Sequence, residues 1–219
     1  MSLVVRNLSD QLFDLVRSRI LSGAVPPDKP IRQDALAAEL GISKIPLREA
    51  LARLEQEGLV HSQANRGFFV RPLSADEAEE VYALRLKLEP DVMALAARRA
   101  SEEERRFAAD TLATVYQVTD EQGGGIGAFN RAFHMALIWP SGQPVTNHFL
   151  ERLHVLSERY ARKHLEPLGR DERANEEHRE MLDTWLARDG DTIARLTHAH
   201  ISKTLDDLRQ QLAGEDAQR

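Results

Sequence analysis

Gly41-Ile42-Ser43-Lys44-Ile45-Pro46-Leu47-Arg48-Glu49-Ala50-Leu51-Ala52-Arg53-Leu54-Glu55-Gln56-Glu57-Gly58 reads as a turn, a helix and a glycine stop. Gly41 has the backbone freedom that ends a preceding helix, and Ser43 can cap a new one. Pro46 falls in the first turn, where its missing N–H does no harm. The stretch therefore predicts a helix that runs to Gly58.

The two sides of this predicted helix differ in character. Leu47, Leu51 and Leu54 recur at helical spacing and form one apolar face. Lys44 and Arg48 lie four residues apart on another face. We expect a helix that packs on its leucine side and presents a basic first turn.

The neighbouring segments complete a winged helix-turn-helix. Apolar residues at helical spacing predict one helix over residues 8–20 and a short one over 34–40, which precedes the turn at Gly41. A short helix, a tight turn and a helix with a basic first turn form a helix-turn-helix. Residues 59–62 and 68–71 are predicted strands joined by a turn rich in Asn and Gly, which makes them a hairpin, or wing.

The second part of the chain is predicted to be all-helical. Pro72-Leu73 marks the boundary, which gives domains of residues 1–73 and 74–219. Ser74 with Glu77 forms a capping box at the start of a long helix, and Ser101 with Glu104 repeats this signal at the start of another. The inward-facing residues predicted for that helix are Val81, Leu84, Leu88 and Leu95. The fold class is mainly α, with an N-terminal winged helix-turn-helix followed by an all-α antiparallel helical bundle of about six helices.

Composition narrows the class of protein. Residues 1–73 hold ten Lys/Arg and eight Asp/Glu, so the acidic excess behind the net charge of −6 lies in the second domain. The chain has no cysteine, which excludes disulfides and thiolate metal sites. No apolar run approaches the roughly 18 residues of a membrane span, and no signal peptide is visible. We expect a cytoplasmic protein without a membrane partner.

The Gly-rich segment 122–127 lacks a following Gly-Lys-Ser/Thr and is predicted to be a loop.

Four polar residues of the second domain form a candidate metal site: Asn130, His134, His178 and His200. Asn130 and His134 share a helix face, and a bundle can bring histidines from two later helices to the same point. Three imidazoles with open positions suit Zn, Ni or Mn. The chain has eight histidines, so a chance trio is easily assembled and spacing alone leaves both readings open. The remaining candidates, His148, His154 and His164, have no matching partners and are expected to be surface or satisfied histidines.

The order of these motifs resembles the GntR family of bacterial transcription regulators, in its FadR-like branch with an FCD ligand-binding domain. The resemblance rests on residues 40–51, 54–60 and 65–70, and then on 81–89, Phe133-His134, Glu177-His178 and His200-Ile201. It implies DNA contacts from Arg32, Ser43, Lys44, Arg48, Asn65, Arg66 and Gly67. Where many relatives carry an arginine near the DNA, this chain has Asp34.

The resemblance also bears on the bundle. Many FCD domains are thought to bind metal through three histidines and an Asp four residues before the first, a position that Asn130 takes here. An amide oxygen is a weaker ligand for a cation than a carboxylate. Arg85 is implied to pair with a small carboxylate effector, and the alternative is a salt bridge to Glu89 at i+4.

These observations predict a non-enzymatic transcription regulator that acts as a repressor. We expect a homodimer on a pseudo-palindromic DNA operator, controlled by a small organic acid bound at the metal site. Two alternatives stand beside it: a metal-dependent hydrolase that uses the same histidines, and a structural bundle without a ligand.

Overall fold

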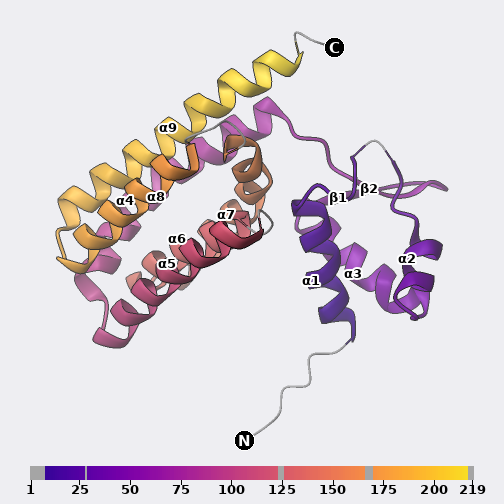
Figure 1. Cartoon of the computed structure of the whole chain (residues 1–219), viewed down its shortest axis with the longest axis horizontal. Helices are drawn as coiled ribbons and strands as arrows, with labels where there is room; N and C mark the ends of the chain where they lie inside the picture. The colour runs from indigo at the N-terminus through magenta and orange to yellow at the C-terminus, as the bar shows by residue number, and fades with distance from the viewer. Residues whose placement is uncertain (1–7, 28, 123–125, 166–169, 217–219) are drawn as a thin grey trace, which may run out of the picture. The chain divides into compact units, whose positions relative to one another are not determined.

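The computed structural model describes residues 8–27, 29–122, 126–165 and 170–216. The chain forms two compact units, Met1–Pro72 and Leu73–Arg219 (Figure 1). The first is a winged helix-turn-helix and the second a six-helix bundle, which confirms the predicted fold class. No helix in the described ranges has the length and apolar character to cross a bilayer.

The first unit is built on three helices, α1 (Leu8–Leu21), α2 (Gln33–Glu39) and α3 (Lys44–Gln56). Leu47, Leu51 and Leu54 of α3 are fully buried and pack with apolar residues of α1, as the leucine spacing predicted. Burying each leucine stabilises the unit by about 1.5–3 kcal/mol relative to an exposed side chain. This core fixes which face of α3 remains outside.

The turn between α2 and α3 depends on Gly41. Its φ of +65° lies in the left-handed region, and its N–H donates to the Ala38 carbonyl at 3.2 Å. Ser43 occupies the N-cap position of α3 with an extended backbone, but its side chain makes no capping hydrogen bond. Ser43 is therefore at the predicted N-cap position, but the expectation that its side chain caps the helix is wrong.

The wing is a two-stranded antiparallel sheet of β1 (Val60–Gln63) and β2 (Gly67–Val70). Gln63 pairs with Gly67, so a three-residue turn with Asn65 at φ 61° joins the strands. Both strands lie within one residue of their predicted positions. A bridge from Pro30 to Phe69 ties the segment before α2 to this sheet.

The second unit consists of α4 (Ala75–Arg99), α5 (Glu102–Gln122), α6 (Ile126–Ile138), a 3₁₀ turn η1 (Trp139–Ser141), α7 (Pro144–Leu165), α8 (Arg170–Leu186) and α9 (Gly190–Asp216). Helices α4 and α9 pack antiparallel, because Glu79 at the start of α4 pairs with Arg209 while Arg98 at its end lies against Gly190. Residues 123–125 of the predicted loop lie outside the described ranges, whereas the loop prediction is wrong for Gln122, which ends α5, and for Ile126 and Gly127, which begin α6.

Side-chain caps start two of these helices. The Ser74 hydroxyl accepts from the Glu77 N–H at 3.3 Å at the start of α4. Ser101 and Glu104 form a reciprocal capping box before α5, with the two backbone bonds at 2.8 and 3.2 Å. Both caps were predicted from the sequence, and each is worth about 1 kcal/mol.

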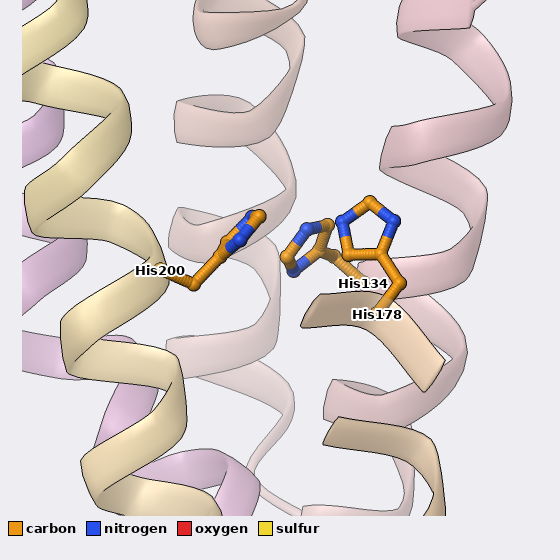
Figure 2. Close-up of side chains that lie close together, drawn as sticks. All are labelled: His134, His178 and His200. Carbon is orange, nitrogen blue, oxygen red and sulfur yellow. The ribbon is translucent and has the colours of Figure 1, made fainter. Parts of the chain in front are cut away.

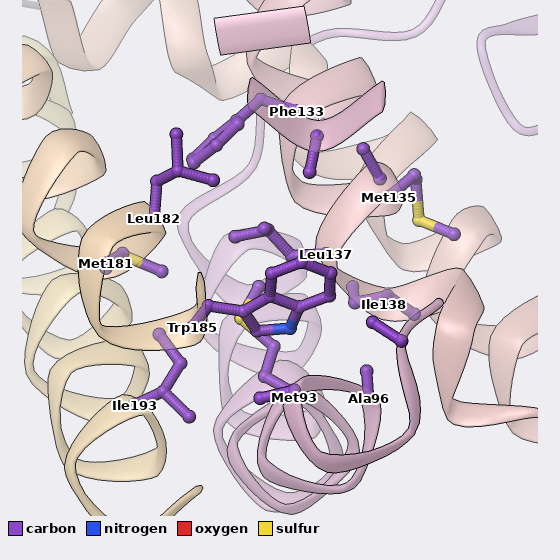
Figure 3. Close-up of a cluster of buried hydrophobic side chains, with 14 of the residues drawn as sticks. Met93, Ala96, Phe133, Met135, Leu137, Ile138, Met181, Leu182, Trp185 and Ile193 are labelled. Carbon is purple, nitrogen blue, oxygen red and sulfur yellow. The ribbon is translucent and has the colours of Figure 1, made fainter. Parts of the chain in front are cut away.

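The main core of the bundle surrounds Trp185, which is fully buried among apolar residues of α4, α6, α8 and α9 (Figure 3). The inward face of α4 differs from the prediction. Leu84 is 38% exposed, whereas Arg85 and Glu89 are buried. The apolar spacing was misleading here because two charged residues occupy the buried face.

Candidate metal centre and nucleic-acid interface

Three histidines from three helices meet inside the bundle. His134 of α6, His178 of α8 and His200 of α9 point toward one another (Figure 2). Their ring centroids lie 4.9 to 5.3 Å apart, and one ring nitrogen from each falls within 4.8 Å of the others. All three residues are buried. The structure therefore brings together the three histidines that the sequence singled out.

The surroundings of His134 suit a metal ligand. Burial lowers its pKa to about 3, so the imidazole is neutral at neutral pH and keeps a lone pair for a cation. Among the described residues, neither ring nitrogen of His134 has a hydrogen-bond partner. Leaving a buried polar atom unpaired costs about 1–3 kcal/mol. A divalent ion held by the three imidazoles would satisfy the Nε2 atom, and the donor set fits Zn, Ni or Mn.

A buried carboxylate lies beside the trio. Glu89 of α4 is fully buried, and its Oε1 lies 3.2 Å from His134 Nδ1, outside hydrogen-bond angles. Its Oε2 lies 3.2 Å from His154 Nε2 on α7. Burial opposes ionisation of Glu89, but Arg85 and the two histidines outweigh it and hold its pKa well below the usual range. Glu89 is therefore an anion that faces the back of His134.

Arg85 neutralises this anion. Its Nε and Nη2 donate to the two Glu89 oxygens at 2.8 and 3.2 Å, and its Nη1 donates to the Ser157 hydroxyl at 3.2 Å. The salt bridge that the sequence left open as one role of Arg85 is thus present. A role of Arg85 in effector binding stays a prediction.

Glu89, His134 and His154 form a second group with metal-ligand spacing. Both carboxylate oxygens already face the Arg85 guanidinium, and a cation bound here would be repelled by that fixed positive charge. We interpret this group as support for the three-histidine site. Sequence reasoning did not find this grouping, because Glu89 and His154 lie 65 positions apart and share no motif.

The other histidines divide by burial. The expectation that His154 lacks a matching partner is wrong, because it is buried at 1% exposure and its ring lies 5.1 Å from that of His134. His148 and His198 are exposed. The side chain of His164 lies outside the described set. Asn130 lies one turn before His134 on α6 and is half-buried, and its role as a ligand stays a prediction.

The predicted DNA-contacting residues of the helix-turn-helix lie on its surface. Arg32, Ser43, Lys44 and Arg48 are all exposed. One contact was not foreseen: Lys44 of α3 forms an ion pair with Asp34 of α2. Their side chains are 60% and 79% exposed, so solvent screens the pair. Asp34 therefore competes for the positive charge at the start of α3.

The wing tip carries the remaining predicted contacts. Asn65 and Arg66 are exposed, and Gly67 at the end of the turn is half-buried. The Arg66 guanidinium lies 5.5 Å from the centre of the Phe69 ring, a cation–π distance that leaves its N–H groups available. The tip offers donors of the kind that contact phosphate oxygens.

Comparison with known families identifies both domains of the chain. The family described as "Bacterial regulatory proteins, gntR family" matches residues 8–70, and the FCD domain matches residues 80–203. The Nta operon transcriptional regulator of Aminobacter aminovorans is 30% identical over 188 residues, which cover 86% of this chain and 88% of that protein. The HTH-type transcriptional repressor GlaR of Escherichia coli (strain K12) is 26% identical over 211 residues, 91% of this chain and 94% of that protein.

Solved structures share the fold. E. coli McbR/YncC matches with a TM-score of 0.78 at 23% identity, covering 94% of this chain and 99% of that one. A putative transcriptional regulator GntR from Rhodococcus sp. RHA1 gives a TM-score of 0.75 at 20% identity, covering 91% and 96%. At such identities the match concerns the fold alone.

We predict that Glu89→Gln destabilises the bundle by about 3–5 kcal/mol, because the variant leaves Arg85 charged and unpaired in the core. The matched control is Glu79→Gln, which breaks the exposed pair with Arg209 and should change stability little. Urea unfolding of EDTA-treated protein, followed by tryptophan fluorescence, measures both, since both tryptophans lie in the bundle. Equal stability of the two variants would contradict the conclusion that Glu89 and Arg85 form a buried ion pair.

Proposed function

The chain belongs to the GntR family of bacterial regulatory proteins and carries an FCD domain, and on this premise we propose that it represses transcription as a homodimer bound to a pseudo-palindromic operator. It is a DNA-binding helix-turn-helix regulator rather than an enzyme, which answers the hydrolase alternative. Its place of action is the cytoplasm, where the operator is accessible.

The exposed basic first turn of α3 carries the proposal. Leu47, Leu51 and Leu54 anchor one side of this helix in the core, and Arg48 lies on another side, exposed to solvent. A recognition helix in the major groove reads bases from its N-terminal residues, and a guanidinium can pair with both acceptors of a guanine. We assign Arg48 this contact and Lys44 a phosphate or single-acceptor contact.

Residues around the helix support docking on the backbone of the DNA. Arg32, Ser43 and the wing residues Asn65 and Arg66 supply exposed donors for phosphates. In a two-fold homodimer the two α3 helices enter successive major grooves, which accounts for a pseudo-palindromic operator. Repression is the proposed sign of regulation, because the similar GlaR is named a repressor.

The bundle is the proposed sensor. His134, His178 and His200 would hold a divalent ion, with Asn130 as a further oxygen donor. The ion would supply a Lewis-acidic position that a small organic acid can ligate. If the carboxylate of this acid also paired with Arg85, it would compete with Glu89. The position of Glu89 beside His134 would then change. Such a ligand changes operator affinity only if it binds one arrangement of the dimer better than the other.

We predict that Arg48→Ala weakens operator binding by about 1–3 kcal/mol for each lost guanine contact and relaxes base preference there. A footprint of the region upstream of the protein's own gene identifies the operator, and mobility shifts then give the affinities. The matched control is Arg53→Ala on the same helix, where Asp10 and the Phe13 ring hold the guanidinium. Unchanged affinity and specificity in Arg48→Ala would reject this docking mode.

We predict that Asp34→Ala tightens binding to operator and unrelated DNA alike, because it frees Lys44 and removes a charge that phosphates repel. One additional phosphate contact should steepen the dependence of log K on log salt by about 1. Glu39→Ala removes the same charge from the other end of α2, where it pairs with Arg19, and should have a smaller effect. If Asp34→Ala gained no more DNA affinity than Glu39→Ala, the Lys44–Asp34 pair would have no effect on DNA binding.

We predict that protein purified without a histidine tag retains about one divalent ion per chain and that His134→Ala loses it. Elemental analysis after extensive dialysis measures the content. His198→Ala, an exposed histidine two residues before His200, should keep the ion. Metal-free wild-type protein, together with no thermal shift on adding metals or organic acids, would favour the structural bundle without a ligand.

A further inference from the structure

One carboxylate at the edge of the trio has no part in the function described so far. Glu177 precedes His178 on α8, and its Oε2 lies 2.7 Å from Nδ1 of His200 on α9. Its Oε1 accepts a hydrogen bond from Lys203 Nζ at 2.8 Å. Glu177 thus joins α8 to α9 directly beside two of the three histidines.

The contact determines which nitrogen of His200 carries the proton. A carboxylate bonded to the Lys203 ammonium is ionised and can only accept hydrogen bonds. His200 must therefore donate from Nδ1, which leaves the lone pair on Nε2.

We propose that Glu177 is a positioning residue, held by Lys203, that fixes the ring and tautomer of His200 so that Nε2 faces the shared point of the three histidines. The inference rests on the proposed metal site. Carboxylates that accept from the second nitrogen of a metal-bound histidine orient the ring and raise its basicity.

Two observations separate this role from direct ligation. Both oxygens of Glu177 are engaged, one by each partner, and the compact donor group in the described part of the chain contains the three histidines without Glu177. Adjacent residues on a helix point about 100° apart. Helix α8 can therefore supply a ligand in His178 and support for another ligand in Glu177.

Glu177 is also a residue whose role can be isolated. Glu89 also lies near Nδ1 of another of the three histidines, His134, but it is fully buried and shared with Arg85 and His154, so its replacement disturbs the core. The Glu177 side chain is 16% exposed, and Lys203 is 55% exposed. A change at Glu177 leaves no buried charge unpaired.

The experiment compares Zn²⁺ affinity of the full chain with that of Glu177→Gln and Glu177→Asp, by competition with a chromophoric chelator. Both variants should bind Zn²⁺ about 10–100-fold more weakly than wild type. Glu177→Gln removes the negative charge, and the shorter side chain of Glu177→Asp moves the charge away from His200. Glu176→Gln, the same change at the exposed neighbouring position, should stay within about 3-fold of wild type. Melting of the metal-free proteins should be unchanged, and the Co²⁺ d–d spectrum of the variants should shift.

The outcomes are distinct. Wild-type affinity in Glu177→Gln, or an equal loss in Glu176→Gln, overturns the inference while the metal site stands. Wild-type affinity in Glu177→Asp alone shows that charge acts without positioning and overturns it as well. Nitrogen NMR of the metal-free chain must show His200 protonated at Nδ1, and the opposite tautomer overturns it. If the wild-type chain binds no ion, both the metal site and this inference fail.

Discussion

The bundle depends on the burial of one negative charge. Glu89 has no exposed surface, and a carboxylate in such a place costs several kcal/mol unless partners surround it. Arg85 supplies the opposite charge from the same helix, while His134 on α6 and His154 on α7 approach from the other side. Helices α4, α6 and α7 must pack in one register to bring these groups together. The same register places His134 where His178 and His200 converge.

The DNA-binding unit obeys a different constraint. Its core is apolar, and the leucines of α3 fix the orientation of that helix; among the unit's described residues, no charged side chain is buried. The functional face is consequently free to vary, and it does so at Asp34, which pairs with Lys44. In the proposed docking mode, Asp34 and a DNA phosphate compete for Lys44, so DNA affinity depends on α2 as well as on the recognition helix α3.

Much of the fold could be predicted because local signals agreed with it. The leucines of α3, the cap at Ser101 and the hairpin residues all act within a few positions of the chain. Leu84 was misassigned because apolar spacing assumes an apolar buried face, whereas Arg85 lies on that face. The three histidines were predicted from their helix positions and the family resemblance, but His154 was not, since its contacts with Glu89 and with the His134 ring arise only in three dimensions.

Helix α7 contacts two different parts of α4 and its start through residues that are close in sequence. His154 and Ser157 lie against the Glu89–Arg85 pair, and Tyr160 exchanges hydrogen bonds with the backbone of Ser74, at 3.2 Å to its N–H and 3.1 Å to its carbonyl. His154 and Tyr160 are six positions apart, which is about 9 Å along the helix axis. One short segment of α7 therefore links the charged core to the backbone of Ser74, just after the boundary between the two units.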